Sequence, residues 1–80
     1  MRRSLQEIQE DAGAIAWFVR TRRKQSGLTQ EDFAEATGVG VRFLKELELG
    51  KPTLRLDKIC QVLQYFGYGL VPAPLPEDRR

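Results

Sequence analysis

Two cationic residues, Arg42 and Lys45, lie three positions apart in a short segment with helical spacing of its apolar residues. Residues three apart share one face of a helix, so both side chains would project together. The planar guanidinium of an arginine can donate two hydrogen bonds to O6 and N7 of guanine in the major groove of DNA. A second cation beside it attracts phosphate. These residue types can therefore recognise nucleic acid, and the alternative at this point is an ordinary solvated face of a helix.

The helix that would carry these cations is predicted over Val41–Glu48. Its apolar residues Leu44 and Leu47 fall on one face, and the two cations fall on the other face together with Glu46. A glycine just past the end and a proline shortly after it, in Leu49–Pro52, are typical signals for the end of a helix. The pattern therefore predicts a short, well-delimited helix that is anchored on one side and exposed on the other.

A second short helix is predicted immediately before it, ending at Thr37. Thr29 is a good N-cap, and Asp32 three residues later is a weaker form of the capping-box acid. Gly38 suits the left-handed position that ends a helix, and Gly40 can begin the next one. Two short helices joined by a tight glycine-containing turn form a helix-turn-helix unit. In such a unit the first helix braces across the DNA backbone and the second enters the major groove.

The N-terminal part of the chain is predicted to be an arm followed by a helix. Residues 1–10 form the arm, whose conformation stays open between a helical turn, a short strand and a loose segment. Asp11 is a plausible N-cap for a helix over residues 12–25. Trp17 and Phe18 are adjacent, so they cannot both face one core stripe, and one of them is expected to be partly exposed.

The rest of the chain completes the predicted domain organisation. The helix-turn-helix domain spans residues 11–67, and its last helix is expected over 56–66, with Cys60 on the inner face. Residues 68–73 are β-compatible and are expected to form a dimerisation strand. Three prolines forbid a long continuation, and residues 74–80 are expected to form a flexible tail.

Composition limits the classes of function. The chain has 80 residues, one cysteine, no histidine and a formal net charge of +2. A domain this small buries a modest core, so a second copy of the chain is the expected support. The residue types argue against a disulfide, a metal centre or another cofactor, and no nucleophile–base set points to an enzyme. No apolar run approaches the ~20 residues of a membrane span, so a cytoplasmic protein is expected.

A combined pattern extends through most of the chain. It consists of Leu28–Ala34, Gly38-Val39, Leu44, Leu47-Glu48 and Gly50–Pro52. Over residues 12–66 this pattern resembles the Cro/phage-repressor (Xre-like) helix-turn-helix family. The resemblance implies an all-α fold, a compact four- or five-helix bundle of the lambda-repressor-like DNA-binding type. It also implies double-stranded operator DNA as a partner and an association with the nucleoid.

The resemblance implies a role for each matching position. Contacts with base edges or the groove fall to Gly40, Val41, Arg42, Lys45 and Glu46. Phosphate contacts fall to Thr29, Gln30 and Lys51, and we add Arg22 from the basic cluster that precedes the motif. Arg23 and Glu48 match a buried ion pair that ties the first helix to the end of the recognition helix. Gly40 and Val41 replace the polar residues usual at these positions, so Arg42 is the main candidate for direct base contact.

The segment Val41–Thr53, then Leu56–Ile59 and Gly67–Leu70, is similar to HipB-type antitoxins. This closer resemblance implies a homodimer whose C-terminal strands pair through Tyr68, Leu70 and Val71. It implies a transcriptional repressor that binds both its operator and a HipA-like kinase toxin, as the antitoxin of a type II toxin–antitoxin system. The alternative is a stand-alone Xre-family transcriptional regulator with no toxin partner.

Overall fold

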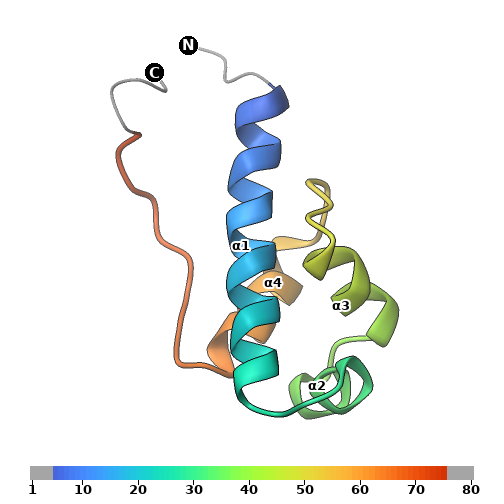
Figure 1. Ribbon diagram of the computed structural model, residues 1–80. Coiled ribbons are helices and arrows are strands. Elements are labelled where there is room, and N and C mark those ends of the chain that lie inside the picture. Colours follow the sequence, from blue (N-terminus) through green and yellow to red (C-terminus); the bar gives the residue numbers. More distant parts are fainter. Residues whose placement is uncertain (1–4, 76–80) are drawn as a thin grey trace.

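The computed structural model describes residues 5–75, with side chains from residue 12 onward. Within that range the chain forms four helices: α1 (Leu5–Gln25), α2 (Gln30–Thr37), α3 (Val41–Glu48) and α4 (Leu56–Gln64). The long α1 runs through the domain, α2 and α3 lie on one side of it, and the segment after α4 runs along the other side (Figure 1). The predicted all-α architecture of four or five helices is confirmed, with four helices in this part of the chain.

The first helix starts earlier than expected, because α1 already begins at Leu5. Residues 5–10 are therefore helical, one of the three conformations that the sequence left open, and Asp11 lies inside the helix. The prediction of an N-cap at Asp11 was wrong. Four of the six residues before it are Gln or Glu, which are good helix formers. Acidic residues near a helix N-terminus also interact favourably with the helix dipole. Residues 1–4 lie outside the described part of the chain.

The core lies where α1, α2, α3 and α4 meet. Its largest fully buried side chains are Phe33, Leu44, Val19 and Val62. Ala34 is buried beside them at the contact between α2 and α3, where a small side chain lets the two helices approach closely. This cluster supplies the hydrophobic stabilisation that holds α3 against the rest of the domain.

Three aromatic rings extend the core toward the end of α4. The Phe33 and Phe66 rings stack with their centroids 5.2 Å apart, and the Phe18 and Phe66 rings meet edge to face at 6.3 Å. Trp17, next to Phe18, is 61% exposed. The expectation that one of these two neighbours faces solvent is therefore confirmed, and the exposed one is the tryptophan.

The C-terminal part differs from the prediction in two respects. The last helix ends at Gln64 rather than Phe66, because the amides of Tyr65 and Phe66 bond back only three residues in a tightened turn. No strand is present within residues 5–75, so the predicted strand over 68–73 is not formed in the single chain. Instead the Tyr68 ring packs on Phe18, with centroids 4.8 Å apart. Of the predicted tail, residues 76–80 lie outside the described range.

Candidate nucleic-acid interface

The turn between α2 and α3 depends on Gly38. Its φ of 80° lies in the left-handed region, and its amide donates to the Ala34 carbonyl at 2.9 Å. A Cβ at this position would lie 2.9 Å from Nε2 of Gln61, which itself donates to the Thr37 carbonyl. The backbone conformation therefore favours glycine, and a side chain here would also displace the Gln61 amide.

The start of each motif helix is set by its first flanking residue. The Thr29 hydroxyl accepts a hydrogen bond from the Asp32 amide at 3.0 Å, as the capping pattern predicted. Gly40 caps α3 through its extended backbone, without a side-chain hydrogen bond. Val39 is buried just before it and fixes the turn against the core. The first-turn amides of α3 thus meet no side-chain cap and lie at the edge of the exposed face.

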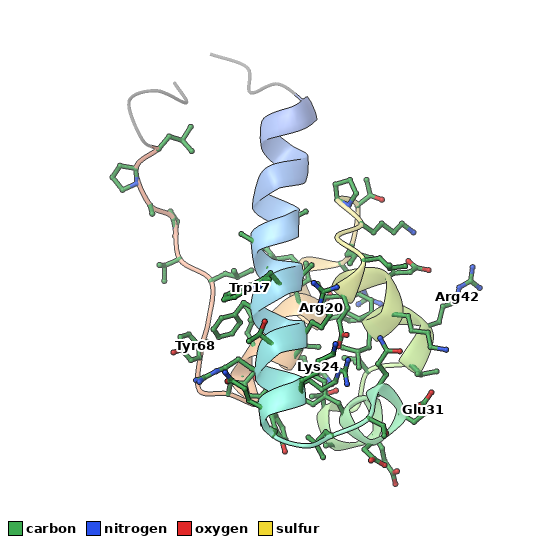
Figure 2. All side chains as sticks on the ribbon, in the orientation of Figure 1. Trp17, Arg20, Lys24, Glu31, Arg42 and Tyr68 are labelled. Carbon is green, nitrogen blue, oxygen red and sulfur yellow. The ribbon has the colours of Figure 1, made fainter. Side chains whose placement is uncertain are left out.

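The α3 helix has one anchored face and one exposed face. Leu44 is completely buried and Leu47 is 3% exposed, whereas the Arg42 side chain is 93% exposed. Figure 2 shows Arg42 projecting away from the domain. Lys45 and Val41 are exposed as well. The structure therefore has the predicted geometry, an exposed helix that is anchored by Leu44.

Glu46 links the two cations that flank it on this surface. Its carboxylate accepts from Lys51 Nζ at 2.9 Å and from Arg42 Nε at 3.3 Å. The hydrogen bond from Lys51, followed by its charge and by the contact with Arg42, lowers the pKa of the Glu46 carboxyl below its ordinary value. The contact with Arg42 uses Nε, and the two terminal amino groups of this guanidinium make no hydrogen bond within the described part of the chain.

A buried ion pair fixes the orientation of α3 relative to α1. Arg23 donates through Nε to Glu48 Oε2 at 2.7 Å and through Nη2 to Oε1 at 2.9 Å. The third branch of the guanidinium, Nη1, donates to the Leu28 carbonyl at 2.8 Å. The hydrogen bond with Glu48 raises the pKa of Arg23. Gln30 Nε2 also donates to Glu48 Oε1, at 3.2 Å, so this carboxylate holds the start of α2 as well.

A hollow of about 400 Å³ opens in front of this ion pair. Its walls carry three exposed cations, Arg20 and Lys24 from α1 and Lys45 from α3, together with the Gln30 amide. Arg20 and Lys24 are one helical turn apart, and Figure 2 shows both on the α3 side of α1. No ion pair neutralises these three cations among the described side chains. The hollow is therefore a site of concentrated positive charge.

Arg22 is the predicted phosphate contact that the structure does not bring to this surface. Its guanidinium carbon lies 5.3–5.8 Å from the centroids of the Phe18, Phe66 and Tyr68 rings, a cation–π arrangement. Because residues two positions apart on a helix point about 200° away from each other, Arg22 faces away from Arg20 and Lys24. That spacing is the signal by which the sequence could have separated the structural member of the basic cluster from the two exposed ones.

Two features are absent from the part of the chain that the structure describes. None of the helices in that part of the chain combines the length and the apolar character needed to cross a membrane. Nor do its Cys, Asp and Glu side chains form a group of three that could hold a metal ion. Cys60 is a free, half-buried thiol on the inner side of α4.

Comparison with known proteins decides the family. The helix-turn-helix family model matches residues 19–71, about two thirds of the chain and all of α2, α3 and α4. The chain belongs to the helix-turn-helix family. This helix-turn-helix protein is also 47% identical over 70 residues to an uncharacterized HTH-type transcriptional regulator, y4mF, of Sinorhizobium fredii, a match that covers 88% of this chain and 87% of that protein. No solved structure matches the chain at a significant level.

Proposed function

We propose that this helix-turn-helix protein is a sequence-specific DNA-binding transcriptional repressor. The single observation that carries the proposal is the geometry of α3, which exposes Arg42 and Lys45 on a rod anchored by the buried Leu44. A helix of this kind fits a major groove about 12 Å wide, with its N-terminal residues toward the base edges. Gly40 and Val41 leave room for close approach, and Arg42 supplies the two-pronged contact with guanine.

The remaining cations position the protein on the DNA backbone. The hollow lined by Arg20, Lys24 and Lys45 receives phosphate, and the Gln30 amide lies at its wall. Lys51 at the end of α3 and Thr29 at the start of α2 extend the contact along the strand. Each phosphate neutralised by a cation releases condensed counterions, so binding weakens steeply as salt rises. The backbone contacts supply affinity and the α3 contacts supply sequence selectivity.

The repressor acts as a homodimer on a two-fold symmetric operator. An 80-residue chain with a small core gains stability from a second copy. A dimer also places two recognition helices in successive major grooves, with half-sites about one helical turn (~34 Å) apart. Repression follows when such an operator overlaps a promoter.

A HipB-like antitoxin role is the more specific form of the proposal. It is supported by the similarity of Val41–Thr53, Leu56–Ile59 and Gly67–Leu70 to HipB-type proteins. A stand-alone regulator accounts equally well for the fold and for the similarity to the Sinorhizobium fredii protein. Co-purification with the product of a neighbouring gene for a HipA-like kinase, and rescue of growth from that kinase, supports the antitoxin role. Absence of such a gene, or failure of rescue, leaves the stand-alone regulator.

Selection from a pool of randomised DNA duplexes tests the main proposal. The wild-type protein is expected to enrich a two-fold symmetric sequence with guanine in each half-site. A matched variant with Arg42→Ala and Lys45→Ala, checked for helical content by circular dichroism, is expected to enrich none. A pool that stays random with the folded wild-type protein contradicts sequence-specific binding.

A further inference from the structure

The outer face of α1 combines a protruding indole with an apolar hollow. We propose that this face pairs antiparallel with α1 of a second copy, so that each Trp17 packs over the other copy's Ala14 at the edge of the hollow. The inference rests on the proposed function in that it supplies the dimer which a symmetric operator requires. It assigns the pairing to Trp17 and Ala14, whereas the sequence had assigned it to the C-terminal segment alone.

The first support is that the protrusion and the hollow lie one helical turn apart. Trp17 is 61% exposed, a large apolar surface for a side chain on a helix in the middle of the domain. The hollow has a volume of about 300 Å³ and lies between α1 and the segment after α4. Its lining consists of Ala14, Ile15, Phe18, Leu63, Tyr68 and Gly69. Figure 2 shows Trp17 on α1 between Tyr68 on one side and Arg20 on the other.

A two-fold axis makes such a face complementary to itself. In an isologous dimer, residue i of one copy contacts residue j of the other and the reverse contact follows by symmetry. An axis midway between positions 14 and 17 sets each indole over the other copy's Ala14, at the edge of the hollow. The small Ala14 side chain leaves the space that the partner indole fills. Both indoles are buried by the same step, and buried aromatic side chains dominate the energy of interfaces.

The second support is charge complementarity along α1. A stripe of positions with alternating spacings of three and four runs along the helix, as in a seam between paired helices. Its residues are Glu7, Glu10, Ala14, Trp17, Thr21 and Lys24. The antiparallel alignment that sets 14 opposite 17 also directs the acidic start of this stripe toward the basic last turn of α1 in the other copy. A parallel alignment would set acidic residues opposite acidic residues and basic opposite basic, which is unfavourable.

The third support is that this pairing places both α3 helices on the same side of the dimer. The two-fold axis of an antiparallel helix pair is perpendicular to both helices and lies in the plane between them. An element to one side of α1 therefore stays on that side in both copies. Figure 1 shows α2 and α3 on one side and the segment after α4 on the other. The pairing thus presents both α3 helices to the same DNA and leaves both Tyr68–Val71 segments on the opposite side.

Trp17 is the only tryptophan of the chain, so its fluorescence reports directly on the pairing. Sedimentation of the wild-type protein is expected to show a dimer whose dissociation, on dilution, shifts the tryptophan emission to longer wavelength. Ala14→Glu is expected to raise the dimer dissociation constant by about 30-fold or more, by filling the hollow's edge with a charge. Trp17→Ala is expected to raise the dimer dissociation constant by a similar factor, measured by sedimentation.

A matched control and a separate DNA measurement make the outcome decisive. Leu56→Ser alters another exposed large apolar residue, 64% exposed on α4, and is expected to leave the dimer intact. Circular dichroism checks that every variant is folded. A wild-type monomer, or a dimer that survives both Ala14→Glu and Trp17→Ala, overturns the inference. Binding of monomeric variants to a single half-site is measured separately, so loss of the pairing and failure of the proposed DNA binding are distinguished.

Discussion

Arg23 on α1 and Glu48 at the end of α3 are 25 residues apart in sequence and meet in a two-pronged ion pair, with N–O distances of 2.7 and 2.9 Å. Both residues are more than nine-tenths buried. Because the same carboxylate also accepts from Gln30, one side chain fixes α1, the start of α2 and the end of α3 together. The exposed cations of α1 and α3 are thereby held in one arrangement before any DNA is bound.

Breaking this pair is expected to destabilise the fold strongly. Glu48→Ala leaves the Arg23 guanidinium buried without its partner, which costs about 3–5 kcal/mol of unfolding free energy. Urea denaturation followed by circular dichroism measures the change. The double variant Arg23→Met with Glu48→Leu removes both charges and is expected to recover most of the stability. If Glu48→Ala lowered the free energy of unfolding by less than about 1 kcal/mol, the ion pair would not be important for holding α1 and α3 together.

Replacement of Arg42 is expected to relax selectivity at one base position. Arg42→Ala removes the two-pronged contact with guanine and reduces discrimination at that position by about 1–3 kcal/mol. Competition binding against operators substituted at single positions measures the effect. Arg42→Lys keeps the charge and loses the fork, so it is expected to restore affinity without restoring selectivity. A variant that retains wild-type discrimination at every position would remove Arg42 from base contact.

The hollow between α1 and α3 is expected to determine part of the salt dependence. Arg20→Gln and Lys24→Gln are each expected to reduce the slope of log affinity against log salt by about one. Arg22→Gln is the matched control, because its guanidinium lies over three aromatic rings on the other side of α1. Equal slopes in all three variants would place the phosphate contacts elsewhere.

Gln30→Ala is expected to weaken binding to all DNA sequences by a similar factor. The amide lies at the wall of the cationic hollow and contacts Glu48, so the substitution affects the backbone contact and leaves the α3 side chains in place. Fluorescence anisotropy with operator and random duplexes measures the two affinities. A change confined to the operator would indicate that Gln30 acts on base contact instead.

DNA affinity is expected to stay constant between about pH 6 and pH 8, because the chain has no histidine to titrate there. The pKa of Glu46 in the folded protein lies below its ordinary value of 4.5. Its contacts with Lys51 and Arg42 are therefore present above that value and are lost only as pH falls through the lowered pKa. Glu46→Gln is expected to reproduce this loss at neutral pH and to strengthen binding to random DNA. A transition near neutral pH in the wild-type protein would contradict the assignment.

The motif itself could be predicted closely from sequence because each of its ends carries a local signal. Thr29, Gly38 and Gly40 act on the backbone within three or four residues, and α2 and α3 begin and end where these residues indicated. The Arg23–Glu48 pair is a tertiary contact, and it was found only through the resemblance to a family. Local capping and turn chemistry thus determined the elements that position the site.

The errors lie where local signals are weak or where tertiary contacts decide. Asp11 is a good N-cap in isolation, but the good helix formers before it carry the helix back to Leu5. The β-compatible residues after α4 have no neighbouring strand in the single chain, and Tyr68 packs on aromatic rings instead. The charge of the basic cluster predicts a phosphate contact for Arg22, whereas the place of Arg22 on α1 depends on which face of the helix meets the core.

Methylation interference on the selected operator shows whether α3 contacts guanine from the major groove. N7 of guanine lies in the major groove and is the atom that Arg42 is expected to contact. N7 methylation of one guanine in each half-site is expected to block the wild-type protein, with the two guanines related by the operator's two-fold symmetry. It is expected to have no effect on the residual binding of Arg42→Ala. Binding that tolerates methylation of every guanine, or that is blocked only by methylation of adenine N3 in the minor groove, would contradict a contact of α3 with guanine.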